Sequence, residues 1–355
     1  MSTVKLGVIG CGNMAKVHMA AIGGENEDTS DELRPYAAAV QLHGLADVTE
    51  EKAAEAQSGF GGEYVTDDPE RIFADPDIDA VLITTWHDTH APFSLRAMEA
   101  GKHVLIEKPM AMTEAECDQI LEAEERTGVK YMVAFRCRFA MGTADVKREI
   151  PNPDNVITFA RVPGIWGPQI WAQDPIKGGG QILSQGCHVV DLMMYLAGSE
   201  PESVYAVGGV KHHESPEVID TVNASVRFAN GAVGSFIGGD GGAGRVLLPG
   251  AYVSCPFFVM ALEKGRSGIA IDHGQNARFE SSVPADVWTP PYEIHDYAEE
   301  FGNNKSSGMG DILPSFTRSI IEDETPIATA VDGARATRFI LKCFESVRTG
   351  EIVNF

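Results

Sequence analysis

The stretch VKLGVIGCGNMA at residues 4–15 decides how this chain folds, because an apolar run leads directly into closely spaced glycines. The run reads as a buried strand, and a helix is expected to begin near Asn13. Gly10 permits a tight turn, Gly12 lets the backbone approach a pyrophosphate, and Ala15 lets the helix pack close to the sheet. The stretch therefore predicts a dinucleotide site, with a glycine-rich turn that binds nothing as the alternative. The expected contacts are Gly10, Gly12, Asn13 and Met14.

Strand-like and helix-like segments alternate through the first 134 residues. Strands alternating with helices indicate right-handed βαβ units and a parallel sheet. Thr113 and Glu116 have the spacing of a capping box at the start of one helix. We therefore expect a Rossmann domain at residues 1–134. Its further strands are expected at residues 41–46, 80–85, 103–106 and 130–135, with helices at 92–100 and 113–126.

The pattern changes after residue 135. Apolar and polar residues alternate over residues 222–228, which predicts a strand. Asn230-Gly231 is a hairpin signal, and residues 232–237 are expected to form the second strand of the hairpin. A last helix is expected at residues 331–348. Because 355 residues exceed the usual size of one domain, residues 135–355 are expected to form a second, sheet-based domain.

The amino-acid composition argues against polyanionic partners and against a membrane-spanning or secreted protein. With 28 basic and 51 acidic residues, the formal net charge of −23 disfavours nucleic acids and anionic membranes. The sequence has neither an apolar run of about 20 residues nor a signal peptide, so we expect a cytoplasmic protein. Its six cysteines contain no CxxC pair, which favours reduced thiols over a disulfide framework or a zinc site.

Asp47 follows the second expected strand, where an acidic side chain can bind the adenosine ribose hydroxyls. A carboxylate there would repel a 2′-phosphate, and Val48 offers no compensating charge. The sequence therefore favours NAD over NADP. The gap from Gly12 to Asp47 is longer than usual, and we interpret the acidic segment 23–34 as an insertion.

Glu107-Lys108-Pro109 closes the expected strand 103–106, and ligands bind at the carboxyl ends of parallel strands. Pro109 fixes the direction of the backbone, and the bond before it is a candidate for the cis form. An oxidised nicotinamide nearby, together with burial, would lower the pKa of Lys108 toward a useful range. The alternative is a surface lysine that follows a strand.

Ser184, His188 and Asp191 lie at positions i, i+4 and i+7 of an expected helix, and therefore on one face of it. Three glycines at residues 178–180 precede this helix and allow a ligand close to the backbone. Histidine is suited to remove an alcohol proton near neutral pH, although a helical histidine can equally be a core residue. No second ligand cluster accompanies Cys187, so we expect no metal.

Together these motifs resemble the Gfo/Idh/MocA family, the glucose–fructose and inositol dehydrogenase group. The matching stretches span the chain at residues 10–15, 75–81, 100–109 and 178–191, and Glu-Lys-Pro is the most specific of them. The resemblance implies an α/β protein, with an N-terminal Rossmann domain and a C-terminal α/β domain built on a large open, mostly antiparallel sheet. It also implies NAD or NADP, a sugar or polyol substrate, and a homodimer or homotetramer.

The resemblance implies the family's lysine role for Lys108 and its histidine role for His188. The sequence departs from the family pattern at Ser184, where inositol-dehydrogenase-like members usually have Asp. Histidine would then be oriented by Asp191 or by the substrate. Cofactor-lining positions are matched by Thr85, His90 and Glu107, whereas Trp86-His87 replaces the usual Pro-Asn and His87 can still reach the nicotinamide ribose.

The leading hypothesis is NAD-dependent oxidation of a secondary alcohol on a sugar, polyol or sugar derivative. Two alternatives remain: a redox-neutral glycosidase or lyase that oxidises its sugar only transiently, and a non-catalytic regulator that senses NAD or sugar. Trp166 and Trp171 can stack on a sugar ring or belong to the core. Arg138 and Asp174 are further candidates for hydroxyl contacts, beside Ser184 and Asp191.

Overall fold

The computed structural model divides the chain into two compact units. The first comprises residues 1–135 and 308–334, and the second comprises residues 136–307 and 335–355. The structure describes residues 2–149, 156–163, 170–213, 217–240, 258–263, 267–271, 276–280, 293–296, 300, 305 and 307–355. Each unit is described by itself below.

The first unit contains a six-stranded parallel sheet with the order β3-β2-β1-β4-β5-β6. The order reverses between β1 and β4, as in a doubly wound dinucleotide-binding fold. Five strands were predicted, and β3 was missed. The strands are β1 (Val4–Ile9), β2 (Val40–Ala46), β3 (Tyr64–Thr66), β4 (Ala80–Ile83), β5 (His103–Ile106) and β6 (Tyr131–Val133).

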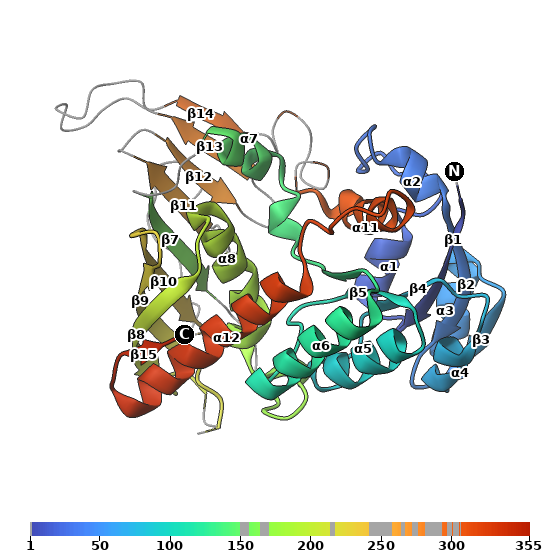
Figure 1. The fold of residues 1–355 in the computed structure, drawn as a ribbon, viewed down its shortest axis with the longest axis horizontal. Helices are drawn as coiled ribbons and strands as arrows, with labels where there is room; N and C mark the ends of the chain where they lie inside the picture. The colour runs from blue at the N-terminus through green and yellow to red at the C-terminus, as the bar shows by residue number, and fades with distance from the viewer. Residues whose placement is uncertain are drawn as a thin grey trace. The chain divides into compact units, whose positions relative to one another are not determined.

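Helices accompany this sheet, and α5 and α6 lie side by side (Figure 1). Every residue of β4 is buried, as expected for a central parallel strand. The capping box predicted at Thr113 and Glu116 is present, and Gly128 ends α6 in the left-handed conformation. The helices are α1 (Asn13–Met19), α2 (Arg34–Ala38), α3 (Glu50–Phe60), α4 (Pro69–Ala74), α5 (His90–Glu99), α6 (Glu114–Thr127) and α11 (Ile312–Ile321).

The acidic segment 23–34 is held by a distant part of the same unit. The hydroxyl of Thr29 donates to the carbonyl of Gly310 at 3.0 Å, and the Ser30 N–H donates to the Asp311 carboxylate at 2.7 Å. Glu32 pairs with Arg318 on α11 at 2.9 Å. The segment therefore packs on the residues that precede α11 and on α11 itself.

The second unit is built on a six-stranded mixed sheet with the order β11-β7-β10-β9-β8-β15. Only the pair β7–β10 is parallel among the pairings described, so the expected mostly antiparallel sheet is confirmed. A separate sheet contains β12 (Ser267–Ile271), β13 (Asn276–Glu280) and β14 (Glu293–Asp296). The strands of the large sheet are β7 (Val156–Pro163), β8 (Pro201–Gly209), β9 (Thr221–Phe228), β10 (Val233–Gly239), β11 (Phe258–Glu263) and β15 (Val353–Asn354).

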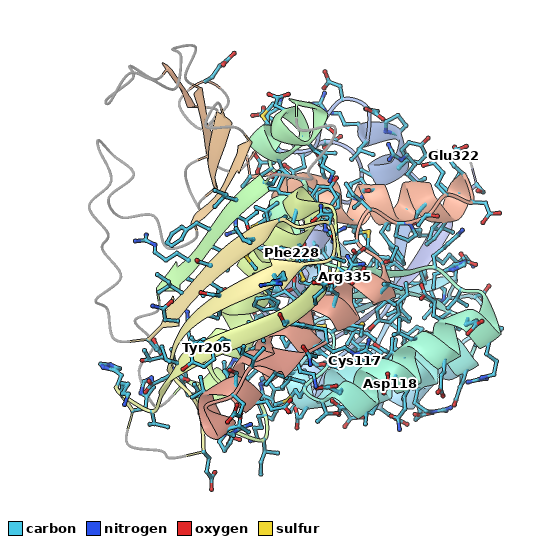
Figure 2. The ribbon with its side chains drawn as sticks, turned by 60° about the vertical axis from the view of Figure 1, so that its left-hand side comes forward. Cys117, Asp118, Tyr205, Phe228, Glu322 and Arg335 are labelled. Atoms are coloured by element: carbon cyan, nitrogen blue, oxygen red, sulfur yellow. The ribbon has the colours of Figure 1, made fainter. Side chains whose placement is uncertain are left out.

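One face of this large sheet is covered by α8 (Gln181–Ala197), which packs on β7, β10 and β11. The predicted alternation in β9 is confirmed, because its residues are alternately buried and exposed along the strand. Phe228 points inward and Tyr205 outward, with exposures of 1% and 45% (Figure 2). Further helices among the described residues of this part of the chain include α7 (Met141–Glu149) and α12 (Ala330–Thr349), the latter predicted at residues 331–348.

No helix within the described ranges combines the length and the apolarity that crossing a membrane requires. Five described cysteines are buried and form no disulfide bond: Cys11, Cys117, Cys137, Cys187 and Cys343.

Candidate active site

The glycine loop lies between β1 and α1, as predicted. Gly10 has a φ of +88°, and a Cβ there would lie 2.8 Å from the carbonyl oxygen of Thr84. A side chain at Gly10 would therefore clash with the backbone next to β4. A Cβ on Gly12 would meet no heavy atom within 4 Å, so the backbone at Gly12 is open to a ligand.

Asp47 lies directly beside this loop. One oxygen of its carboxylate accepts the Cys11 N–H at 2.7 Å, and the other accepts the Val48 N–H at 2.7 Å. The charge of Asp47 and, to a larger extent, burial raise the pKa of the Cys11 thiol to about 12, so this thiol is no nucleophile near neutral pH. The second strand thus places an acid at the glycine loop despite the long spacing from Gly12.

Polar side chains gather at the carboxyl end of β4. The ring nitrogens of His90 lie 2.7 Å from the carbonyl oxygen of Pro109 and 3.1 Å from that of Thr85. Burial lowers the pKa of His90 in spite of these carbonyl oxygens. His87 is buried with its ring 5.5 Å from that of His90, whereas Trp86 is 43% exposed. His90 therefore links the ends of β4 and β5.

At the end of β5, Glu107 is buried and its carboxylate oxygen lies 2.9 Å from Nε2 of His18. Burial alone would raise the pKa of Glu107, but the hydrogen bond and charge of His18 lower it below its ordinary value. The bond between Lys108 and Pro109 is cis, as the sequence allowed. Lys108 is half-buried at the carboxyl edge of the sheet, where a ligand is expected.

His18 was missed by the sequence interpretation. It lies on α1, is completely buried, and contacts a residue 89 positions away. A single histidine in a helix carries no signal of such a contact. Its position one helical turn after the glycine loop is the only hint the sequence offers.

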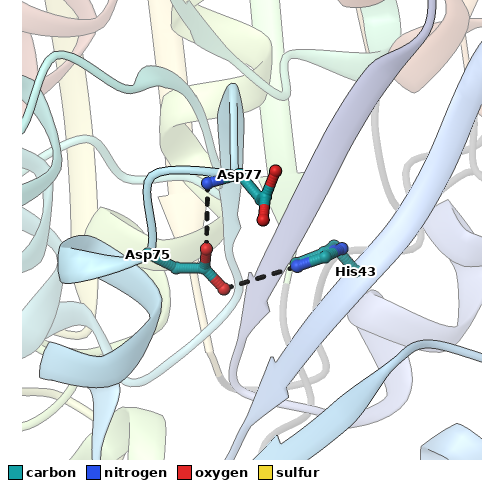
Figure 3. Close-up of side chains that lie close together, drawn as sticks. All are labelled: His43, Asp75 and Asp77. Carbon is teal, nitrogen blue, oxygen red and sulfur yellow. Dashed lines mark hydrogen bonds and ion pairs between the residues drawn. The ribbon is translucent and has the colours of Figure 1, made fainter.

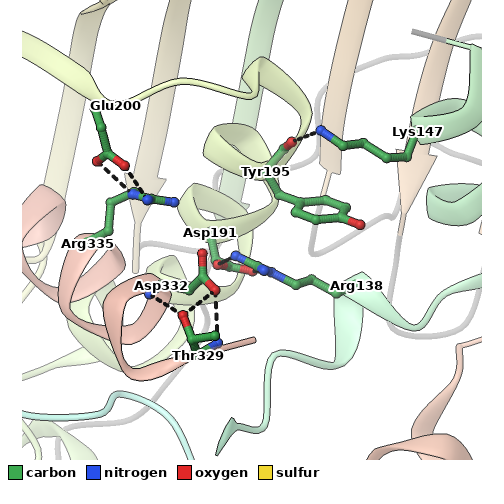
Figure 4. A network of polar contacts seen from close by, with 8 residues as sticks. All are labelled: Arg138, Lys147, Asp191, Tyr195, Glu200, Thr329, Asp332 and Arg335. Atoms are coloured by element: carbon green, nitrogen blue, oxygen red, sulfur yellow. Dashed lines mark hydrogen bonds and ion pairs between the residues drawn. The ribbon is translucent and has the colours of Figure 1, made fainter. Parts of the chain in front are cut away.

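In the second unit, α8 begins after Gly180 and carries Ser184, His188 and Asp191, all of them buried. Asp191 accepts two hydrogen bonds from the guanidinium of Arg138, at 2.9 and 2.6 Å (Figure 4). Arg138 also stacks over the ring of Tyr195 with 4.5 Å to its centroid. Two residues predicted to contact substrate hydroxyls therefore bind each other.

The glycines before α8 are in close contact with their surroundings. A Cβ on Gly178 would lie 2.2 Å from Cα of Ala172. Asp174 organises this turn, because its carboxylate accepts the N–H groups of Ile176 and Lys177 at 2.8 and 3.0 Å. Trp171 precedes the turn and is 40% exposed. Trp166, the other predicted stacking residue, lies outside the described residues.

A separate cluster of His43, Asp75 and Asp77 lies near the amino end of β4 (Figure 3). Asp75 accepts hydrogen bonds from the Asp77 N–H and the Tyr64 hydroxyl, each at 2.9 Å, and its carboxylate lies 3.4 Å from His43. Asp77 pairs with Lys5 at 2.9 Å. These hydrogen bonds and ion pairs account for the cluster without a metal ion.

Comparison with known proteins identifies the family. Residues 4–135 match the family model described as "Oxidoreductase family, NAD-binding Rossmann fold", and residues 154–245 match the "GFO/IDH/MocA C-terminal domain". The chain belongs to the Gfo/Idh/MocA family. It is therefore an oxidoreductase with an N-terminal NAD-binding Rossmann domain, as the motifs predicted.

Several relatives in this family are named for sugars and inositols. Levoglucosan dehydrogenase of Pseudarthrobacter phenanthrenivorans is 32% identical over 269 residues, which cover 66% of this chain and 67% of the relative. Myo-inositol 2-dehydrogenase of Thermotoga maritima is 29% identical, with coverage of 65% and 67%. A solved levoglucosan dehydrogenase complex with NADH and L-sorbose has a TM-score of 0.84 at 24% identity, covers 100% and 99% of the two chains, and shares this fold.

Proposed function

We propose that the chain is an NAD-dependent dehydrogenase that oxidises a secondary alcohol of a sugar, polyol or sugar derivative. The observation that carries the proposal is Lys108 at the carboxyl end of β5, next to the buried Glu107–His18 pair. In a Rossmann sheet this edge faces the cofactor. Relatives named for levoglucosan and myo-inositol support a polyol substrate.

The residues at the glycine loop fit a dinucleotide. Open space around Gly12 admits a phosphate against the backbone, and the Asp47 carboxylate lies where ribose hydroxyls would bind. The negative charge of Asp47 would repel a 2′-phosphate, so we infer NAD rather than NADP. When bound, the nicotinamide supplies the acceptor for the hydride. Further contacts are proposed for Asn13, Met14, Thr85, Trp86, His87, His90, Glu107 and Lys108.

We assign His188 to remove the proton of the substrate hydroxyl and Lys108 to donate a hydrogen bond to the same oxygen. Imidazole has the pKa for this transfer near neutral pH, and the ammonium stabilises negative charge as it develops. The two residues belong to different units, and the proposal requires that both serve one reaction. Supporting contacts to substrate are proposed for Arg138, Trp166, Trp171, Asp174, Ser184 and Asp191.

Replacement of the two residues tests the assignment. Lys108→Ala and His188→Ala should each lower kcat by about 10²–10⁴-fold, because each removes acid–base or electrostatic assistance. NAD binding, followed by fluorescence titration, should persist in the His188 variant. Lys5→Ala and His43→Ala are controls at the amino edge of the sheet and should turn over normally. Normal kcat in both test variants would overturn the mechanism.

Substrate class and cofactor require a screen of sugars and inositols with NAD and NADP in parallel, followed by NADH absorbance. Stoichiometric NADH with levoglucosan, myo-inositol or a related polyol supports the proposal. The buried Ser184, at the position of the usual Asp, favours one second candidate, a redox-neutral glycosidase or lyase. Bond cleavage with only catalytic NAD would establish that candidate. Tight NAD binding without turnover of any compound would instead indicate a regulator.

We also propose a cytoplasmic homodimer or homotetramer. The outward face of the large sheet exposes apolar side chains on β7, β10 and β8, whereas β9, between β10 and β8, exposes polar ones. Exposed apolar patches mark association surfaces. Register places Ile237 next to Asn223, and Asn223 next to Val207, across three of these strands. The exposed apolar residues on these strands are Ile157, Tyr205, Val207, Val233 and Ile237.

A further inference from the structure

A buried polar cluster in the second unit takes no part in the chemistry proposed above. Asp240 follows β10, is completely buried, and its carboxylate oxygen lies 2.7 Å from Nε2 of His213. The side-chain amide of Gln173 donates to the same oxygen and lies 3.1 Å from the His213 ring nitrogen. Three segments that are far apart in the sequence therefore meet through these three side chains.

The backbone that carries His213 is fixed to the large sheet. The Asp220 carboxylate accepts the N–H groups of Lys211, His212 and His213 at 2.8, 2.8 and 2.7 Å. Burial would raise the pKa of Asp220, but these donors lower it, so it remains an acceptor. The Asp240 N–H donates to the Asp220 carbonyl at 3.0 Å. His213 and Asp240 are thus anchored at the same end of the strand pair β9–β10.

Gln173 connects this anchor to the glycines before α8. It ends the short helix η3 (Trp171–Gln173), and the Gly180 N–H donates to the carbonyl of Ala172 at 2.8 Å. A Cβ on Gly180 would lie 2.2 Å from Cγ1 of Val218, in the connection between β8 and β9. Gly180 is also the N-cap of α8. A shift of Gln173 would therefore move both Trp171 and the start of α8.

We propose that His213 and Asp240 are positioning residues that act through Gln173. They hold residues 171–180 so that Trp171 faces a bound polyol. This inference rests on the proposed dehydrogenase function for its substrate. It makes the pair a determinant of substrate affinity, not a participant in proton transfer.

The chemistry of the pair explains why it can hold a loop. A buried carboxylate is costly unless donors satisfy it, and His213 and Gln173 supply two of the donors. Removing His213 leaves the Asp240 charge poorly compensated, which weakens the hold on Gln173. Glutamine at position 213 keeps a donor of similar reach and should preserve the arrangement.

Hydrogen exchange tests the link independently of any activity. In His213→Ala, the amides of residues 171–180 should exchange about tenfold faster, equivalent to about 1.4 kcal/mol of lost protection. His213→Gln should restore most of this protection, and Asp240→Asn should lose it. Lys211→Ala is a control in the same turn, because its backbone bond to Asp220 remains. Unchanged exchange of residues 171–180 in both His213→Ala and Asp240→Asn would overturn the inference.

Kinetics of the holoenzyme test the consequence for substrate. With a polyol that the wild-type chain oxidises, His213→Ala should raise KM about tenfold while kcat and the NAD dissociation constant change less than about twofold. A tenfold fall in kcat with an unchanged KM would overturn the positioning role. If the wild-type chain oxidises no polyol, the proposed function fails, whereas the exchange experiment still decides whether His213 holds the loop.

Discussion

Glu107 shows how its neighbours keep a single buried carboxylate charged at the end of β5. It is 6% exposed, and His18 from α1 holds one of its oxygens at 2.9 Å. Its other oxygen accepts the N–H of Lys108 at 3.2 Å. These contacts keep Glu107 charged and fix the backbone at the residue that we assign to catalysis.

The lowered pKa of Glu107 gives a prediction about stability. Between that lowered value and 4.5, the unfolded chain binds a proton that the folded chain does not, so stability falls as pH decreases through this window. Glu107→Gln removes the titration and leaves weaker hydrogen bonds. It should lower the free energy of unfolding by about 1–3 kcal/mol above pH 5, measured by urea unfolding.

The difference between wild type and Glu107→Gln should narrow as pH falls below 4.5. Glu55→Gln provides a control, because this glutamate is exposed and pairs only with Lys16 among the interactions described. A difference between wild type and Glu107→Gln that stays constant from pH 3.5 to pH 7 would show that folding does not lower the pKa of Glu107.

Single residues also mark the limit of what the sequence could reveal about the site. The i, i+4, i+7 spacing correctly placed Ser184, His188 and Asp191 on a helix, because that spacing follows from helical geometry. It could not show that Asp191 binds Arg138, 53 residues away. Partners of buried charges depend on how elements pack, and a sequence read one segment at a time does not contain that arrangement.

At the scale of elements, short sequence patterns predicted those strands and helix ends that depend on interactions between neighbouring residues. Strand β4 is a continuous apolar run, β1 and β5 are apolar apart from Lys5 and His103, and the capping box of α6 lies within four consecutive positions. Strand β3 was missed because it has only three residues and no apolar run. The docking of segment 23–34 on residues 310–318 was also invisible, because nearly 290 positions separate the two.

The absence of a side chain at Gly310 allows segment 23–34 to pack closely, and this gives a second prediction. A Cβ at this position would lie 2.7 Å from the backbone carbonyl of Asp28, which cannot move without disturbing the segment. Gly310→Ala should therefore lower the free energy of unfolding by about 1–3 kcal/mol. Urea unfolding measures the loss, and limited proteolysis should cleave the variant faster within residues 23–34.

Gly59 provides the matched control for this substitution. It is exposed within α3, and a Cβ there would meet no heavy atom within 4 Å. Gly59→Ala should raise stability by about 0.5–1 kcal/mol, because alanine favours a helix interior. If the two variants changed stability equally and in the same direction, contact with Asp28 would not be the cause.

At the scale of the whole molecule, charge and apolar surface act in opposite directions. Each chain carries a formal charge of −23, so two copies repel at low ionic strength. Apolar side chains on the outward face of the large sheet would have to overcome this repulsion. Since salt screens charge but not burial of apolar surface, association should strengthen as salt increases.

Val207→Asp tests this balance on the outward face. Val207 is 51% exposed on β8, and register places it next to Asn223, whose neighbour on the other side is the exposed Ile237. A buried, unpaired carboxylate in an interface should shift the oligomer toward monomer, as measured by light scattering after gel filtration. Val331→Asp is the control, because Val331 is also 51% exposed but lies on α12. A monomeric wild type at about 0.5 M salt, or an oligomer indifferent to Val207→Asp, would exclude this face as the interface.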